Sequence, residues 1–206
     1  MKRVLNSGSI KLPYVKGSEK ERLDTFRYVG VSDEDVIKFI FTNNPAVLNH
    51  VEFTFEIKAP LLVFLALQEA HLGALNRLEE QDHQIAYLPA EFYGQEGLTL
   101  NIMDSKTCNV YYTKLYNFYN AAFNFYNNLV RDGLCEEQAK LVLPQGVFVN
   151  FLWKVTAKDL ITFIEDNYNK SPEMFGYCST LVLYLEEHLP LVTKWLKSNK
   201  WQNISL

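Results

Sequence analysis

Arginine is scarce in this sequence, which has 206 residues and a formal charge of −4 at neutral pH. The chain therefore lacks the basic surplus with which proteins neutralise the phosphates of a nucleic acid. A guanidinium group also binds phosphate through paired, charge-assisted hydrogen bonds, and this chain can offer few of them. These shortages argue against nucleic-acid binding. The arginines are Arg3, Arg22, Arg27, Arg77 and Arg131.

Cysteine and long apolar runs are also scarce. Cys108, Cys135 and Cys178 are odd in number and far apart, which fits neither a disulfide framework nor a zinc site, so we expect reduced thiols in a cytoplasmic protein. The longest apolar run, 59–67, is about half of the roughly 20 residues that a membrane span needs. The N-terminus has no apolar run of signal-peptide length. The sequence therefore predicts no membrane segment.

What the chain does have is the composition of a packed globular protein, with 48% hydrophobic and 21% charged residues. Its length suits one domain over residues 1–206. The clearest strand is 50–58, where apolar residues alternate with polar ones. Leucines and a phenylalanine at helical spacing then predict a helix from Pro60 to Leu78.

The remaining elements give an α+β domain whose C-terminal half is rich in helices. Ser32 is predicted to cap a helix that ends at 43–45, and Gly133 to close a long helix over 111–130. Other strands are expected at 10–14 and 98–102, and other helices at 136–143, 157–165, 172–188 and from Pro190 onward.

Four blocks of this sequence resemble the flavin-dependent thymidylate synthases. Residues 50–60 read His-Val-Glu-Phe-Thr-Phe-Glu-Ile-Lys-Ala-Pro, close to the family's strand before its signature helix. Residues 88–93 match the family's Glu-Phe-Tyr, 137–144 its Glu-x-Ala-Arg-x-Val-Leu-Pro, and 151–160 its Phe-x-Trp-Thr-Val-Asn-Ala-Arg-Ser-Leu. The blocks occur in the family's order and cover roughly residues 8–185.

This resemblance implies a flavin-dependent thymidylate synthase-like fold, with a mixed sheet and helices, assembled as a homotetramer. It also implies sites at subunit interfaces for FAD, dUMP and a folate methylene donor. In the family, reduced flavin supplies a hydride and the methylene group is delivered to uracil C5.

The family's signature, Arg-His-Arg-x-x-Ser-x-Asn-Glu-x-Ser-x-Arg, is rewritten in this chain. Aligned from Lys-Ala-Pro, its first three residues fall on Glu69, Ala70 and His71, and only Asn76 is kept. A carboxylate at a phosphate-binding position repels the ligand by about 1 to 4 kcal/mol at 4 Å. FAD is thus implied as the cofactor by resemblance, while the Arg-His-Arg motif that would bind it is replaced. The signature's Glu falls on Arg77, its first Ser on Ala74, its second Ser on Glu79 and its last Arg on Gln81.

The other matched blocks supply further candidates. Lys140 stands where an arginine contacts the dUMP phosphate in the family. Thr156 and Lys158 replace the Asn and Arg that contact flavin, and Asn167 falls where a catalytic arginine is expected. The resemblance thus implies cofactor-binding positions at His71, Asn76, Thr156 and Lys158, and substrate-binding positions at Lys140, Arg77 and Gln81. It identifies no catalytic residue and no metal ligand in this chain.

Three patterns allow alternatives. Glu80-x-x-His83, with His71 upstream, has a di-iron spacing, but a second such pair is needed, and we expect a solvated loop. The aromatic series at 111–126 could stack on bases; we favour one face in the core and the other against another subunit. Lys140 and Lys158 are either remnants of anion sites or ordinary surface lysines.

Two hypotheses of function follow from the resemblance. The first is a flavin-dependent enzyme of pyrimidine deoxynucleotide metabolism with an altered substrate or altered C5 chemistry. The second is a non-catalytic scaffold or regulatory member of the fold, which self-assembles or pairs with an intact synthase. FAD binding separates the two.

Overall fold

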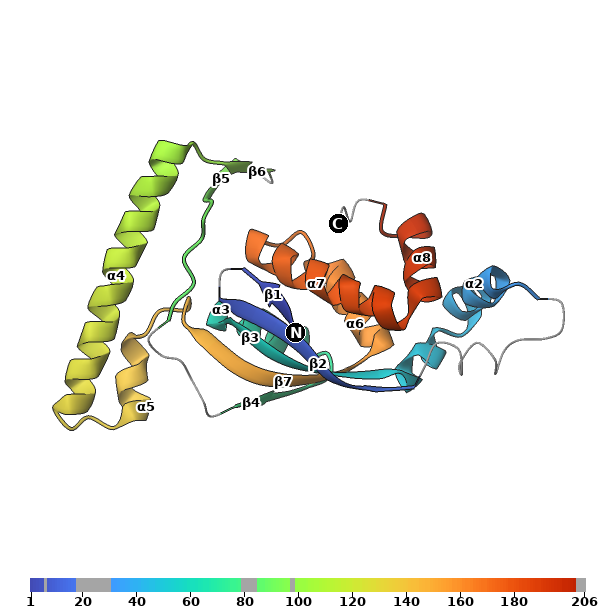
Figure 1. Ribbon diagram of the computed structural model, residues 1–206, viewed down its shortest axis with the longest axis horizontal. Helices are drawn as coiled ribbons and strands as arrows, with labels where there is room; N and C mark the ends of the chain where they lie inside the picture. Colours follow the sequence, from blue (N-terminus) through green and yellow to red (C-terminus); the bar gives the residue numbers. More distant parts are fainter. Residues whose placement is uncertain (6, 18–30, 79–84, 97–98, 203–206) are drawn as a thin grey trace. The chain divides into compact units, whose positions relative to one another are not determined.

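The computed structural model describes residues 1–5, 7–17, 31–78, 85–96 and 99–202. They form two compact units, seen in Figure 1. The first comprises Met1–Ala59, Val63–Glu79 and Asn150–Leu206, and the second comprises Pro60–Leu62 and Glu80–Val149. The expectation of a single domain over 1–206 stays a prediction.

A five-stranded sheet is the centre of the first unit, with the strand order β1-β2-β3-β7-β4. The pairs β1–β2, β2–β3 and β4–β7 are antiparallel. The sheet and the helices around it confirm the α+β prediction. The strands are β1 (Lys2–Val4), β2 (Gly8–Lys16), β3 (Glu52–Pro60), β4 (Ala74–Arg77) and β7 (Phe148–Thr156).

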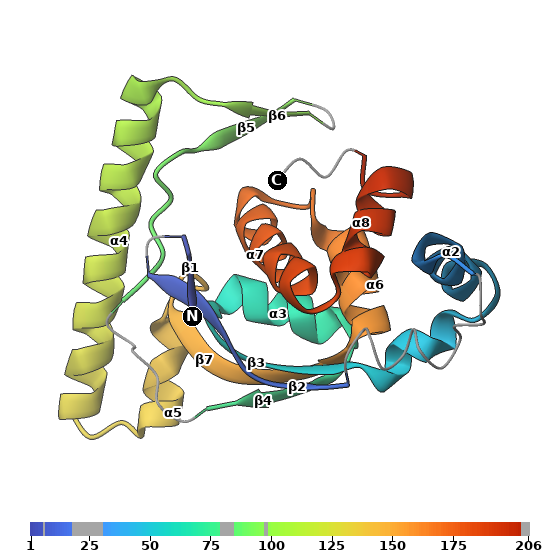
Figure 2. The same cartoon turned by 45° about the vertical axis from the view of Figure 1, so that its right-hand side comes forward.

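One face of this sheet carries the core. The predicted alternation in β3 is confirmed, since Phe53, Phe55 and Ile57 are buried and the residues between them are half-exposed. The rings of Phe55 and Trp153 lie 6.0 Å apart, and Trp153 packs edge-on against Phe163 of α6 at 5.2 Å. Figure 2 shows α6 and α7 on this side of the sheet. The opposite face carries charged side chains, described below.

The helices of the first unit begin and end largely where the sequence predicts. Ser32 caps α2 by accepting a hydrogen bond from the Asp35 amide at 3.2 Å, and Ser171 caps α7 in the same way through the Met174 amide. The helices are α2 (Asp33–Asn43), α3 (Leu61–Ala70), α6 (Ala157–Asn167), α7 (Pro172–His188) and α8 (Pro190–Asn199), with a 3-10 helix η1 (Pro45–His50).

The predicted helix from Pro60 to Leu78 is wrong beyond Ala70. The backbone turns at His71 and Gly73, which have φ values of 52° and 73°, in the left-handed region that ends a right-handed helix. The chain then forms β4, which pairs with β7. The leucines keep a helical spacing beyond Ala70 because Leu75 lies on the core side of β4, opposite Trp153.

The second unit contains a long helix, α4 (Ser105–Arg131). It confirms the predicted helix over 111–130 but begins earlier, because the Asp104 carboxylate accepts hydrogen bonds from the amides of Lys106 and Thr107. Gly133, with φ 95°, follows its end. The predicted helix over 136–143 is two short turns. The other elements are β5 (Tyr93–Glu96), β6 (Thr99–Ile102), α5 (Glu136–Ala139) and the 3-10 helix η2 (Lys140–Val142).

Membrane insertion of a helix is not supported anywhere in the described part of the chain. Even α4, the longest helix, lacks an apolar stretch able to cross a bilayer.

Candidate functional site

The turn between α3 and β4 carries the rewritten signature. Glu69 is exposed near the end of α3, and His71 is exposed just after it. The indole Nε1 of Trp153 donates a hydrogen bond of 2.8 Å to the carbonyl oxygen of Leu72. A Cβ atom on Gly73 would lie 2.3 Å from the carbonyl oxygen of Lys154, so only glycine allows this approach to β7. The turn is thus fixed by its contacts with one neighbouring strand.

Asn76 and Arg77 lie on opposite faces of the sheet. In the β4–β7 register Asn76 stands opposite Leu152, and Arg77 stands opposite Phe151. Phe151 is fully buried on the helix-covered face, so Arg77 belongs to that side and Asn76 to the open side. Both residues are exposed. The structure therefore separates the predicted cofactor position Asn76 from the predicted substrate position Arg77.

Gln81 and both members of the Glu80-x-x-His83 pattern lie outside the described residues, so these assignments stay predictions. Within the described ranges there is no group of three or more His, Cys, Asp and Glu side chains able to hold a metal ion.

Thr156 and Lys158 lie at the start of α6. The Thr156 hydroxyl oxygen accepts a hydrogen bond of 3.1 Å from the Asp159 amide, which caps the helix. This role explains why a short polar residue stands there without any reference to flavin. Lys158 is exposed in the first turn. Its side chain is thus accessible to an anion.

Lys140 belongs to the second unit and has an internal partner. Its ammonium group lies 2.7 Å from the Glu137 carboxylate, and the two side chains are 24% and 84% exposed. An anionic ligand at Lys140 must compete with that carboxylate, although exposed ion pairs of this kind contribute little, about 0 to 1 kcal/mol.

Asn167 is buried and is not accessible to a ligand. Its side chain is 3% exposed, and its Nδ2 donates a hydrogen bond of 2.8 Å to the Phe163 carbonyl oxygen one turn earlier in α6. The position at which the resemblance predicts a catalytic arginine therefore serves helix packing in this chain.

Sequence reasoning missed Lys154, Lys16 and Glu52 as a group. Lys154 lies 3.3 Å and Lys16 4.0 Å from the same oxygen of Glu52 on the open face of the sheet. The alternation of buried and open residues in β7 could have revealed Lys154, but β7 itself was not predicted.

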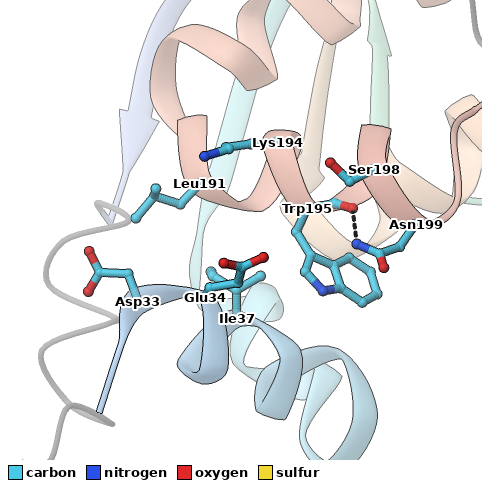
Figure 3. Close-up of a pocket in the computed structure, with 8 residues that line it drawn as sticks. All are labelled: Asp33, Glu34, Ile37, Leu191, Lys194, Trp195, Ser198 and Asn199. Atoms are coloured by element: carbon cyan, nitrogen blue, oxygen red, sulfur yellow. Dashed lines mark hydrogen bonds between the residues drawn. The ribbon is translucent and has the colours of Figure 1, made fainter. Parts of the chain in front are cut away.

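A small cavity lies between α2 and α8, and its lining includes none of the predicted positions (Figure 3). Its volume is about 70 Å³, far below the roughly 300–1,000 Å³ of typical small-molecule sites. Trp195 lines it and stacks on Phe41 at 4.2 Å, which holds the two helices together. The cavity is too small for a nucleotide or a flavin. Its other lining residues are Asp33, Glu34, Ile37, Leu191, Lys194, Ser198 and Asn199.

The sheet, its helices and the matched blocks define a thymidylate synthase-like α+β protein. Residues 9–191 match the family described as thymidylate synthase complementing protein, and the chain belongs to this family.

Curated relatives support the same assignment. The flavin-dependent thymidylate synthase of Thermosipho melanesiensis is 24% identical over 180 residues, covering 79% of this chain and 77% of that protein. The Thermotoga neapolitana enzyme is 24% identical over 173 residues, covering 78% and 76%. The Borreliella burgdorferi enzyme is 20% identical and covers 92% of this chain and 80% of its own. The predicted family resemblance is confirmed.

Solved structures show the same fold. The UMP/dUMP methylase PolB from Streptomyces cacaoi, bound with 5-Br UMP, superposes with a TM-score of 0.81 at 15% identity, covering 96% of this chain and 97% of that one. Its structure bound with 5-Br dUMP gives a TM-score of 0.82, covering 94% and 96%. The predicted fold is therefore confirmed.

Proposed function

We propose that this protein is a divergent, flavin-dependent member of the family that acts on a pyrimidine nucleotide, with an altered substrate or altered C5 chemistry. The observation that carries the proposal is the family match over residues 9–191, which includes the blocks that hold Lys140 and Lys158. Each lysine keeps the positive charge of the family's arginine. The similar structures carry uridine nucleotides of both sugar types, so UMP belongs beside dUMP among the substrates to test.

Ordinary methylation of dUMP is disfavoured by the loss of arginine. Glu69, His71 and Gln81 stand at the three arginine positions of the signature. Asn167, a buried amide, stands where a further, catalytic arginine is expected. Lysine attracts a phosphate as a point charge but does not provide the paired hydrogen bonds of a guanidinium group. Ligand binding is expected to be weaker and its electrostatics different.

Assembly through α4 is part of the proposal, because the family resemblance implies a homotetramer. The helix has no charged residue between Lys114 and Arg131. Phe118 and Phe125, which are seven residues apart and therefore lie on one side of the helix, are 56% and 53% exposed, whereas Ala122 and Tyr126 face inward. Aromatic residues are enriched at the centres of protein interfaces. A second copy of the chain would cover this outward face and complete sites shared between subunits.

A second candidate is a non-catalytic scaffold or regulatory member that has lost FAD and dUMP binding. The Lys140–Glu137 ion pair and the capping role of Thr156 favour it, because both side chains already have structural partners. Such a protein would retain the fold and the assembly surface while its ligand positions served packing.

Titration of the pure protein with FAD, followed calorimetrically and by flavin fluorescence, tests the two candidates. Micromolar binding, followed by a further response to dUMP or UMP, would support the enzyme. Lys158→Gln should then weaken FAD binding about fivefold, whereas the exposed Lys170→Gln should leave it unchanged. No binding at about 100 µM, equivalent to less than roughly 5.5 kcal/mol of affinity, would exclude it.

A further inference from the structure

The open face of the sheet carries one carboxylate shared by two lysines. Glu52 lies on β3, between Lys16 on β2 and Lys154 on β7. Its Oε2 atom is 4.0 Å from the Lys16 ammonium and 3.3 Å from the Lys154 ammonium. The lysine side chains are 64% and 55% exposed, and Glu52 is 28% exposed. The cluster is accessible and fixed to three adjacent strands.

This cluster has an excess of positive charge. Two ammonium groups and one carboxylate leave a formal charge of +1. The same face provides a balanced comparison, since Lys11 lies 3.0 Å from Glu56 in a pair of one cation and one anion. An anion is therefore attracted to the Lys16–Glu52–Lys154 cluster more strongly than to the Lys11–Glu56 pair.

The cluster lies next to the rewritten signature strand. Lys154 stands directly opposite Ala74 in the β4–β7 register, and Asn76 is its diagonal neighbour on the same face. The Cα atoms of such diagonal neighbours on two strands are about 7–8 Å apart, within reach of a long side chain. Lys154 thus supplies a cation beside β4, the strand that follows the replaced Arg-His-Arg positions.

We propose that Lys154 and Lys16 bind a phosphate or pyrophosphate group. Glu52 is the counter-ion of the two lysines when no ligand is bound and competes with the ligand for them. Recognition of the phosphate follows from the cluster alone. The identity of the molecule that carries it, a flavin dinucleotide or a pyrimidine nucleotide, rests on the proposed function.

Calorimetric titration with inorganic pyrophosphate tests the site directly. Lys154→Gln and Lys16→Gln should each weaken binding about fivefold, the factor expected for one charge at about 4 Å in water. Lys11→Gln, on the same face, should change affinity less than twofold. Glu52→Gln should tighten binding, because it removes the competing carboxylate. Circular dichroism will check that every variant keeps the fold.

Three results would overturn the inference: no pyrophosphate binding by the unmodified protein, an equal effect of Lys11→Gln, or weaker binding by Glu52→Gln. A parallel titration with FAD, riboflavin and dUMP separates it from the proposed function. Pyrophosphate binding without FAD or dUMP binding would leave the phosphate site standing and refute the enzyme. FAD and dUMP binding that Lys154→Gln and Lys16→Gln leave unchanged would refute the phosphate site and leave the enzyme standing.

Discussion

Trp153 and Leu72 lie 81 residues apart in the sequence, yet the indole Nε1 of Trp153 donates a hydrogen bond of 2.8 Å to the Leu72 carbonyl oxygen. This bond ties the signature turn to the most buried part of β7, where Trp153 is fully covered. A contact made by the core therefore determines where the exposed residues of the turn are held.

Trp153→Phe is expected to release that turn. The variant keeps an aromatic ring in the core but loses the hydrogen-bond donor, and we expect a loss of about 1–3 kcal/mol of unfolding free energy. Urea denaturation will measure the loss, and hydrogen exchange should quicken for the amides of 71–77. Trp201→Phe, which loses a 3.1 Å bond to Glu165, is the control. If the amides of 71–77 exchange equally slowly in both variants, the Trp153–Leu72 hydrogen bond does not hold the turn in place.

Gly73→Ala should be far more harmful than Gly133→Ala. Both glycines have positive φ, and the left-handed conformation costs a non-glycine residue about 1–2 kcal/mol. At Gly133 nothing lies within 4 Å of an added Cβ, whereas at Gly73 the Lys154 carbonyl oxygen would be 2.3 Å away. We expect about 1 kcal/mol for Gly133→Ala and more than about 3 kcal/mol for Gly73→Ala, measured by urea denaturation. Similar losses of unfolding free energy in the two variants would show that β7 moves away from the added Cβ atom at little cost.

The three thiols should react at very different rates. Cys135 is exposed, Cys108 is half-buried and Cys178 is buried. In the native protein a thiol reagent such as dithionitrobenzoate should modify Cys135 first, and Cys178 only on unfolding. Mass spectrometry of the modified peptides gives the order. Early modification of Cys178 would contradict its burial.

Stability should fall in alkaline solution, partly because of Cys178. Burial raises the pKa of its thiol from 9.0 to about 12. The unfolded chain loses this proton first. The contribution of the protonated Cys178 thiol to the free energy of unfolding is therefore complete below pH 9 and is lost as pH rises towards 12. The slope reaches at most about 1.4 kcal/mol per pH unit for one group. Urea denaturation at about pH 8 and about pH 10 should show a shallower decline for Cys178→Ala. If the free energy of unfolding declines equally in Cys178→Ala and in the unmodified protein, groups other than Cys178 cause the decline.

Self-association should depend on the outward aromatic residues of α4. Phe125→Glu places a charge on the proposed interface and should dissociate the assembly, which light scattering after gel filtration will detect. The exposed Phe118 gives a second test on the same face. If the unmodified protein is a monomer, or if Phe125→Glu leaves the assembly intact, α4 does not carry the interface.

The sequence predicted the elements whose signals are local. Ser32 and Ser171 cap helices through their own side chains, and the alternation in β3 follows from one face being buried. β7 was missed because it is apolar on both sides near its start, where Phe148 and Val149 are both buried. β4 was missed because its pairing with β7 depends on residues far away in the chain.

The candidate site was predicted only in part, for a related reason. Motif matching located Lys140, Thr156 and Lys158, but the roles of the first two depend on partners that a motif does not specify. The separation of Asn76 from Arg77 required the strand register. The role proposed for Lys154 depends on its contact with Glu52 and, through it, on Lys16, and both residues are distant in sequence.

Asn167 bears on which substitutions this part of α6 can accept. Its amide is bonded to Phe163 within α6 and is nearly inaccessible to solvent. An arginine introduced there would have to bury an unpaired charge, at a cost of several kcal/mol. A single substitution of that kind would destabilise the protein by itself. The packing of the helix around one amide therefore closes position 167 to charged side chains, and such changes are cheaper at the exposed positions of the fold.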